Sequence, residues 1–246
     1  MPLETRAWGR RKTCTLLKFL LAHRGDVLAV DQILDALYPH ADPQRAAGNL
    51  RTRISELRRG LESHLKCGAD SQYVLRVAPG CYLFSKDAPC RVDIELFEGH
   101  LRAARKLVHQ QQWPEALEHF EEAVALYGGD FLAEDRYEEW TLAFREHYRQ
   151  LFHEALEGCS DLYARSRRYA EAVATLQRVL EDDPCRESAY QRLMLYENDR
   201  GDTQKALQAY ERCVKELRAQ IDREPSPETR SLAERIRKGL VEREAN

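Results

Sequence analysis

The 246-residue sequence lacks several features that would place it in familiar classes of protein. It has no uninterrupted apolar run of about 18 residues, so we expect no membrane-spanning helix. The N-terminal stretch MPLETRAWGRRK has no apolar core, so we expect no secretory signal peptide. Its seven cysteines form no CxxC pair and no Cys/His cluster with the spacing of zinc ligands. We interpret them as reduced thiols, mostly core residues, and expect a cytoplasmic protein without a metal site.

Sequence motifs of common enzymes are also missing. The sequence contains no GxxxxGK[ST], HExxH, GxSxG or GxGxxG pattern. The segment FHEALEG has one histidine but lacks the second that a zinc site of this kind requires. We therefore expect a protein that is not an enzyme, with no catalytic residue and no cofactor.

Charge is distributed unevenly along the chain, although the formal net charge is only −3. Residues 1–92 contain 15 Lys and Arg against 9 Asp and Glu, a net of +6. Residues 93–246 contain 23 against 32, a net of −9. This asymmetry predicts two domains, 1–92 and 93–246, with different partners.

The basic first part combines helical periodicity with a hairpin pattern. Residues 10–25 predict a helix that ends near a glycine, and VDQILDALYP predicts a second helix that ends before its proline. A third helix is expected over about 44–62. The β-rich runs 74–77 and 81–84 flank an Ala-Pro-Gly turn and predict a β-hairpin. Three helices and a hairpin indicate a winged helix-turn-helix domain, which is typical of DNA binding.

The third helix contains the candidate DNA-binding residues. In NLRTRISELRRGL, four apolar residues recur at steps of four, three and four, so they share one narrow buried stripe. The other side combines small, hydroxyl and basic residues, which can approach a duplex and contact phosphates or guanine edges. The candidates on this helix are Arg45, Asn49, Arg51, Thr52, Ser55, Arg58 and Arg59. Further candidates for contacts to the DNA backbone are Arg10, Arg11 and Lys12 before and within the first helix, and Arg76 in the hairpin.

From residue 93 onward the sequence predicts helices only, with an internal repeat. Three segments align on the alanines Ala116, Ala172 and Ala206, of which the last two are 34 residues apart, the tetratricopeptide period. We expect an all-α, tetratricopeptide-like (TPR) repeat of three helical hairpins. PSPETRSLAERIRKGL predicts a terminal helix that begins after Ser226. The tryptophans are interpreted as packing residues rather than ligand stackers.

Together the segments RRKTCTLLKFLLAHRG, NLRTRISELRRGL, GCYLF, DIELFE, RRYAEAVATLQRVLEDDP and EPSPETRSL resemble the bacterial transcriptional activator domain family. This family is typified by the SARP activators of Streptomyces, and the resemblance covers about residues 10–240. It implies a mainly α fold in which an OmpR-like winged helix precedes a TPR-like activator domain. The family usually begins with an antiparallel sheet, for which nine residues before Arg10 are too few. The chain is then either a fragment of a longer protein or has lost that sheet.

The resemblance also implies a function and partners. It implies a transcriptional activator that binds promoter DNA with its third helix in the major groove, often on direct repeats as two protomers. It places Tyr38, His40, Asp42 and Gln44 in a loop that contacts RNA polymerase in relatives. The helical domain is then expected to bind a signal or protein partner, or to self-associate.

Two alternative interpretations of the residues remain open. A basic amphipathic helix is often only a solvated surface, although the helix–loop–helix–hairpin context favours DNA binding. The chain could also be a protein-interaction scaffold whose acidic repeats bind a partner and whose winged helix binds protein. A lack of DNA affinity at low salt would favour the scaffold.

Overall fold

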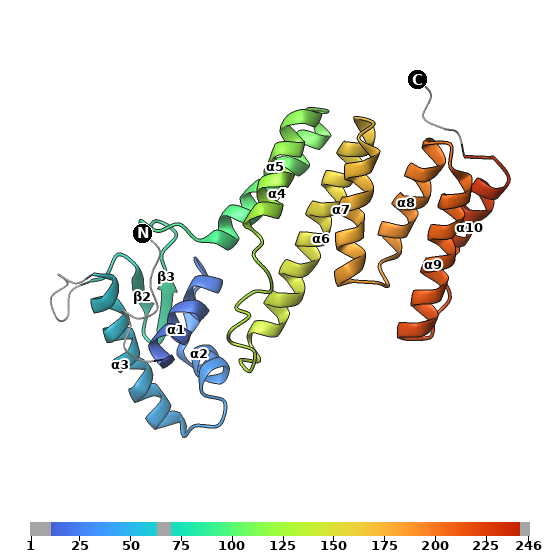
Figure 1. The fold of residues 1–246 in the computed structure, drawn as a ribbon. Helices are drawn as coiled ribbons and strands as arrows, with labels where there is room; N and C mark the ends of the chain where they lie inside the picture. The colour runs from blue at the N-terminus through green and yellow to red at the C-terminus, as the bar shows by residue number, and fades with distance from the viewer. Residues whose placement is uncertain (1–10, 63–69, 242–246) are drawn as a thin grey trace. The chain divides into compact units, whose positions relative to one another are not determined.

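The computed structural model describes residues 11–62 and 70–241, which form two compact units (Figure 1). One unit comprises Met1–Val92 together with Glu134–Leu142, and the other comprises Asp93–Ala133 together with Ala143–Asn246. The sequence alone assigned residues 134–142 to the second domain, whereas the structure groups them with the first. Arg10 and the segment where relatives carry a sheet lie outside the described residues.

The first unit is a winged helix. Its elements are α1 (Arg11–Ala22), β1 (Leu28–Ala29), α2 (Val30–Leu37), α3 (Pro43–Leu61), β2 (Val74–Ala78) and β3 (Cys81–Phe84). The strands form an antiparallel sheet in the order β1-β3-β2, so β1 extends the predicted hairpin. Leu20, Ile33, Leu57 and Phe84 are buried together in one core from α1, α2, α3 and the sheet. The predicted winged helix is therefore confirmed.

Gly25 allows the chain to turn from α1 into the sheet. Its φ is +91°, a conformation that side chains disfavour, and its N–H donates to the Phe84 carbonyl at 2.9 Å. A Cβ at this position would lie 2.1 Å from the Lys86 Cε atom. Any other residue would therefore be strained by this φ and would also displace the Lys86 side chain.

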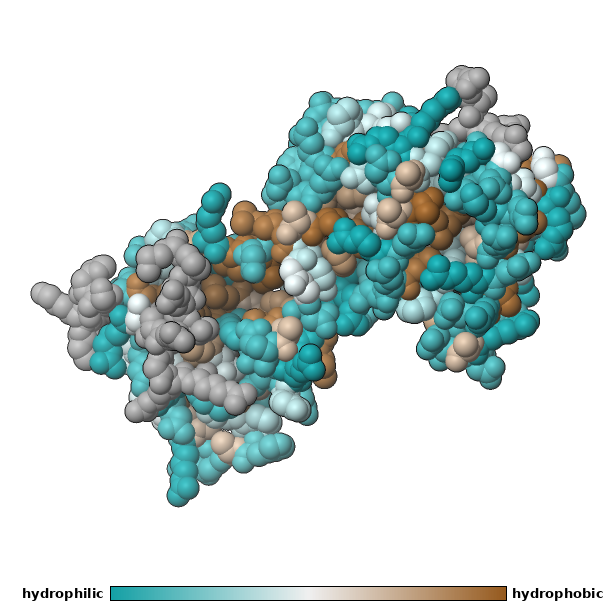
Figure 2. Space-filling model, viewed as in Figure 1, coloured by the Kyte–Doolittle hydropathy of each residue, from teal (hydrophilic) through white to brown (hydrophobic). Residues whose placement is uncertain are grey.

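Among its described residues the second unit has helices as its regular structure and no strand. The helices are α4 (Asp93–His109), α5 (Trp113–Leu126), α6 (Thr141–Arg165), α7 (Tyr169–Asp182), α8 (Glu187–Asp199), α9 (Thr203–Ile221) and α10 (Pro227–Arg237), and α6 enters the unit from Thr141 and Leu142 of the first unit. The predicted anchors Ala116, Ala172 and Ala206 lie on α5, α7 and α9, and all three are fully buried. On the face drawn in Figure 2, hydrophilic residues cover most of this unit and hydrophobic residues are seen mainly between its helices. The expected helical repeats are confirmed.

The longer first repeat spacing arises from the connection between α5 and α6. Within the second unit, the Arg145 guanidinium donates to the carbonyls of Phe131 and Leu132 at 2.9 Å each. Within the first unit, Lys18 on α1 binds Glu134 at 2.7 Å and Asp135 at 2.5 Å. The two halves of the connection are therefore anchored separately.

The same connection contributes to the winged-helix core. Trp140 packs edge-on against Phe19 of α1, with 5.1 Å between ring centroids. This confirms the packing interpretation for this tryptophan. Burial opposes the charge on Lys18, but the two carboxylates outweigh it and raise the Lys18 pKa.

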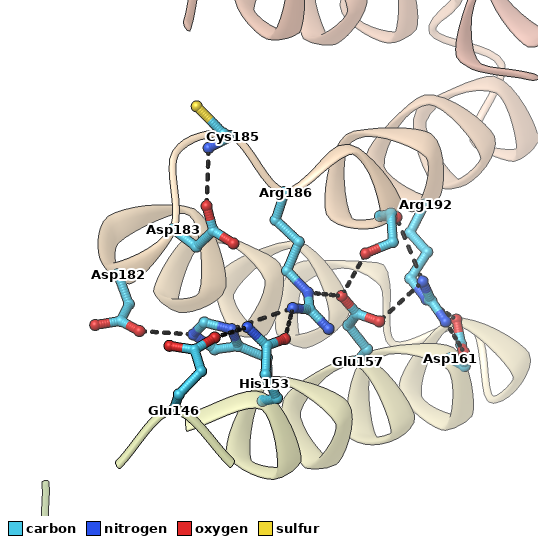
Figure 3. A network of polar contacts seen from close by, with 11 residues as sticks. Glu146, His153, Glu157, Asp161, Asp182, Asp183, Cys185, Arg186 and Arg192 are labelled. Atoms are coloured by element: carbon cyan, nitrogen blue, oxygen red, sulfur yellow. Dashed lines mark hydrogen bonds and ion pairs between the residues drawn. The ribbon is translucent and has the colours of Figure 1, made fainter. Parts of the chain in front are cut away.

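A polar network holds α6 against the start of α8 (Figure 3). Buried His153 contacts Asp182 through Nε2 at 2.7 Å and the Arg186 guanidinium through Nδ1 at 3.3 Å. Arginine only donates hydrogen bonds, so Nδ1 is the acceptor and Nε2 carries the proton given to Asp182. Arg186 also binds Glu157 at 2.5 Å. The network therefore specifies one tautomer of a buried histidine.

The described cysteines are reduced thiols that form no disulfide. Cys159 and Cys213 are buried, and burial raises the pKa of each of these two thiols to about 12. Cys14, Cys81, Cys90 and Cys185 are half-buried, and of these Cys14, Cys90 and Cys185 pack against the hydrophobic cores, in line with the core interpretation for most of the described cysteines. Cys67 lies outside the described residues.

Candidate nucleic-acid interface

Local sequence signals position the start of α3. The Asp42 carboxylate accepts a hydrogen bond from the Arg45 backbone N–H at 2.9 Å, and Pro43 occupies the first helical position. The helix therefore begins one residue earlier than the expected 44. Asp42, which the resemblance placed in a polymerase-contacting loop, thus also has a structural role as the helix cap.

The buried side of α3 differs slightly from the prediction. Leu50, Ile54 and Leu57 are buried as expected, and Ala46 joins them one turn earlier. Leu61 is only half-buried because it is the last residue of the helix, at the edge of the core. The stripe still fixes which side of the helix faces the core.

The other side of α3 brings together most of the predicted contact residues. The exposed ones are Arg45, Asn49, Arg51, Thr52, Ser55 and Arg59. Gly48 lies among them, and a Cβ at this position would meet no atom within 4 Å. The Thr52 hydroxyl donates to the Gly48 carbonyl at 3.2 Å, within the same helix. This side of α3 therefore has short side chains at its centre, is polar and positively charged, and is exposed within the first unit.

The two acidic residues of this region are turned away from that surface. Glu56 accepts hydrogen bonds from Arg53 at 2.5 Å and from the Thr13 hydroxyl of α1 at 2.8 Å. Glu62 is buried, where it accepts from the Ser71 hydroxyl and from the Gln72 N–H. The sequence suggested that both would oppose the positive charge of the helix. Glu56 is thus paired with Arg53, and both carboxylates bond inside the unit rather than to the exposed arginines of α3.

Some predicted contact residues have partners inside the protein. Arg58 donates from Nε to the carbonyl of Val74 at 2.9 Å, and so holds the start of β2. Lys12 donates to the Leu37 carbonyl at 3.3 Å, and its Nζ lies 5.3 Å from the centroid of the Tyr38 ring. The Arg11 backbone lies in α1, but its side chain is outside the description, as is Arg10.

The hairpin presents one basic residue. Arg76 is exposed on β2, opposite Tyr82 on β3. Val77 beside it is 46% exposed, and Gly80 in the turn has a φ of +73°. The wing therefore offers one cation beside the exposed apolar residues Val77, Ala78 and Pro79 at its tip.

The segment Tyr38–Gln44 is mixed in character. His40 and Gln44 are exposed. Tyr38 is half-buried, and this burial raises the pKa of its hydroxyl. Apart from Tyr38, the whole segment, residues 39–44, is therefore accessible within the first unit.

The sequence analysis missed Arg24, which holds the segment after the wing. Its guanidinium donates to four backbone carbonyls, those of Ser85 (3.0 Å), Lys86 (2.7 Å), Ala88 (3.0 Å) and Cys90 (3.3 Å). No periodicity marks this role, because the acceptors lie more than 60 residues away in the chain.

Residues 11–62 and 70–241 contain no helix with the length and hydropathy needed to cross a bilayer. Across the same ranges, His, Cys, Asp and Glu side chains nowhere gather in a group of three that could hold a metal ion.

Comparison with known proteins places the chain in a family. Residues 92–237 match the bacterial transcriptional activator domain, and residues 5–84 match the family described as transcriptional regulatory protein, C terminal. The chain belongs to the bacterial transcriptional activator domain family. The resemblance inferred from the sequence is therefore confirmed.

Members of the bacterial transcriptional activator domain family are among the similar proteins. The chain is 29% identical to the transcriptional regulatory protein MoaR1 of Mycobacterium bovis, over 94% of this chain and 74% of that protein. It is 25% identical to the regulatory protein DnrI of Streptomyces peucetius, over 92% and 84%. The regulatory protein AfsR of Streptomyces coelicolor matches at 27% identity over 95% of this chain but only 22% of its own length.

A solved structure shows the same fold. Mycobacterium tuberculosis EmbR, in complex with a low affinity phosphopeptide, superposes with a TM-score of 0.83 at 24% identity. The match covers 95% of this chain, which spans 61% of that EmbR chain. Family and relatives together identify a DNA-binding transcriptional regulator of the bacterial transcriptional activator domain family, and they do not favour the scaffold alternative.

Proposed function

We propose that α3 is the recognition helix of this regulator and enters the major groove of promoter DNA. The observation that carries the proposal is the composition of its exposed side. Arg45, Arg51 and Arg59 surround Gly48, Thr52 and Ser55, whereas Glu56 and Glu62 are engaged inside the unit. A helix side with short residues at its centre and arginines around them fits the major groove. The short residues let the helix backbone approach the bases, and the guanidinium groups reach phosphates or guanine edges.

Two kinds of contact follow from the positions on the helix. Thr52 and Ser55 lie among the short side chains at the centre of the exposed side, where their hydroxyl groups can contact base edges. Arg51 and Arg59 extend from it and can bind phosphates or fork onto guanine. Arg58 contributes chiefly by fixing β2, because its Nε is already bonded to the Val74 carbonyl.

The test measures DNA affinity by fluorescence anisotropy, with DNA from upstream of the gene and the full chain. Arg51→Ala and Arg59→Ala should each weaken binding by about 1–3 kcal/mol if they read bases. The control is Arg102→Ala, because Arg102 is an exposed arginine of the second unit, paired with Glu98 at 3.2 Å. Equal affinities for wild type, both α3 variants and the control would refute the assignment of α3.

The contact with RNA polymerase is a separate part of the proposal. Exposed His40 and Gln44 are available for it, whereas Asp42 caps α3. In transcription with purified polymerase, His40→Ala combined with Gln44→Ala should lower activation several-fold while DNA affinity stays within twofold. Unchanged activation would remove this segment from the polymerase contact.

We further propose that two protomers bind direct repeats on the promoter. Sedimentation of the chain with DNA carrying one or two half-sites distinguishes the stoichiometries. Two protomers should bind the double site, with higher affinity per protomer than on the single site. A single protomer on the double site would contradict the proposal.

A further inference from the structure

The helical unit contains a groove of about 520 Å³ that the DNA-binding role does not use. Its size falls in the range of about 300–1,000 Å³ that is typical of ligand pockets. Val108, Phe120, Leu162 and Leu195 contribute an apolar floor from α4, α5, α6 and α8. The groove is therefore built by consecutive hairpins of the repeat.

Acidic residues outnumber basic ones around this floor. The described lining includes the acids Glu154, Glu157, Asp161 and Asp199 and the bases Arg165 and Arg192. The lining side chains alone thus have a formal charge of −2, within a part of the chain whose net charge is −9, although Arg105 and Arg186, which do not line the groove, pair with Glu154 and Glu157. A cationic group is the ligand that this charge would attract.

Two of these acids hold the groove in shape. Asp161 binds Arg192 through both oxygens, at 2.9 and 3.1 Å, and Glu157 contacts the same guanidinium at 3.2 Å (Figure 3). Only 9% of the Glu157 side chain is exposed. These two carboxylates therefore hold the Arg192 guanidinium in place at the groove.

Two of these acids have partly exposed side chains. The Glu154 side chain is 43% exposed and that of Asp161 is 48% exposed. Glu154 accepts two hydrogen bonds from Arg105, at 2.6 Å each, whereas a carboxylate offers about four acceptor positions. Asp161 accepts from Arg192 at both oxygens and from the Tyr196 hydroxyl at 2.5 Å. Each of the two side chains therefore keeps an acceptor position for a donor from a ligand.

Trp113 supplies the second half of a cation site. One part of its ring packs against the core of α4, α5 and α6, and the Arg165 guanidinium carbon lies 4.1 Å from the ring centroid. Among the described residues, Arg165 has no carboxylate within ion-pair distance, and it is exposed. An exposed arginine over a tryptophan face occupies the position that a ligand cation would take.

We propose that this groove binds a short basic segment of a partner protein. An arginine or lysine of that segment replaces Arg165 over Trp113 and donates to Glu154 and Asp161. An apolar neighbour of that residue packs on Phe120, Leu162 and Leu195. Arg165 is then an internal competitor, which keeps the Trp113 face covered when no partner is bound. The inference specifies the partner chemistry of the helical unit and does not depend on α3.

The test uses the full chain and the acetylated, amidated peptide Ala-Leu-Arg-Leu-Ala, with binding followed by calorimetry. The peptide with citrulline in place of arginine has the same shape without the charge and should bind at least tenfold more weakly. Arg165→Gln should strengthen binding of the arginine peptide several-fold, because the competitor is removed. Trp113→Leu should weaken it by roughly 3- to 30-fold, which is the range of a cation–π contact.

Arg168→Gln is the matched control. Arg168 also lies over an aromatic ring, 4.5 Å from the Tyr163 centroid, but it does not line the groove. This variant should bind the arginine peptide like the wild type. Trp113→Phe, which keeps a ring, and thermal melting of each variant separate a lost cation site from a misfolded unit. Arginine amide alone tests whether a small cation suffices, and binding equal to that of the peptide would contradict the protein segment.

Three results would overturn the inference. They are equal binding of the arginine and citrulline peptides, no gain in affinity for Arg165→Gln, or an Arg168→Gln effect as large as that of Arg165→Gln. DNA affinity measured on the same preparations should stay unchanged, so failure here is distinguishable from failure of the assignment of α3.

Discussion

At the scale of single residues, arginines with similar sequence surroundings have different physical roles. Arg51 and Arg58 lie on the same helix, seven residues apart. Arg51 is exposed, whereas Arg58 donates to a carbonyl of β2. Arg24 binds four carbonyls of one segment, a role that a charge count cannot detect. The contact list of each guanidinium, and not its presence on a basic helix, determines what its removal does.

Arg58→Ala should therefore lower both the stability of the first unit and its affinity for DNA. Loss of its bond to Val74 should lower the free energy of unfolding by about 1 kcal/mol. Arg51→Ala should leave that free energy unchanged within about 0.5 kcal/mol. Urea unfolding of both variants checks this, and equal unfolding midpoints for the two would show that the Arg58 bond is dispensable.

Arg24→Ala should destabilise the first unit more strongly. The substitution leaves four carbonyls without their charged donor, and water replaces it only in part, so we expect a loss of about 2 kcal/mol. Arg91→Ala, at an exposed position just beyond the same segment, serves as the control. A loss equal to that of the control would mean that solvent compensates fully.

At the scale of elements, the terminal helix α10 is held by one carboxylate. Glu187 at the start of α8 accepts hydrogen bonds from the Ser226 N–H at 2.9 Å, the Ser226 hydroxyl at 2.8 Å and the Thr229 hydroxyl at 2.5 Å. Ser226 also caps α10, as the sequence predicted. Beyond these bonds, Ala233 and Ile236 pack against Met194. Gln191 of α8 also donates to the Thr229 hydroxyl at 2.8 Å, so α10 covers the last hairpin through several polar bonds and an apolar contact.

This arrangement predicts that acid releases α10. Burial of the Glu187 carboxyl disfavours its charge, but the bonds from Thr229 and Ser226 outweigh this and lower the Glu187 pKa. A lowered folded-state pKa stabilises the protein above the unfolded value of about 4.3, and the stabilisation is lost as pH falls through the folded value. Between about pH 5 and pH 3, hydrogen exchange in α10 should therefore rise more steeply in the wild type than in Glu187→Gln.

The Glu187→Gln variant also provides the control for this experiment. At pH 7 its α10 should already exchange faster than in the wild type, because a neutral amide accepts these bonds less strongly. Parallel pH profiles for the two proteins would assign the acid sensitivity to another group.

At the scale of the whole molecule, the opposite charges of the two parts of the chain separate their partners. The first 92 residues carry a net of +6 and the remainder −9. Duplex DNA attracts the first part through released counterions, and a basic protein segment suits the second. The net charge of the whole chain, −3, therefore indicates neither of these partners.

DNA binding should consequently depend steeply on salt despite the negative net charge. The logarithm of the association constant should fall linearly with the logarithm of salt concentration, with a slope of about −0.9 for each phosphate contacted. If Arg59 contacts a phosphate, Arg59→Ala should reduce the magnitude of the slope by about 1. The slope is measured by anisotropy over a salt series, with Arg102→Ala as the reference. An affinity that does not change with salt would contradict electrostatic recognition of DNA.

The sequence by itself determined the elements and the face that each buries. The periodicity of Leu50, Ile54 and Leu57, the cap at Ser226 and the repeated alanines act within one or two helical turns, where spacing alone decides which residues share a side. These local rules were sufficient for the winged helix, the helical repeats and the exposed residues of α3.

Only the tertiary structure decided which charges remain available to a ligand. Glu56 and Glu62 are turned from the exposed arginines of α3 by bonds to Thr13 and Ser71, and residues 134–142 join the first unit through Lys18, more than 100 residues away. Trp113 was expected to be a packing residue only, yet one face of its ring lines a groove together with residues of α6 and α8. Such pairings depend on distances in space between segments that are remote in the chain. Periodicity carries no information about them.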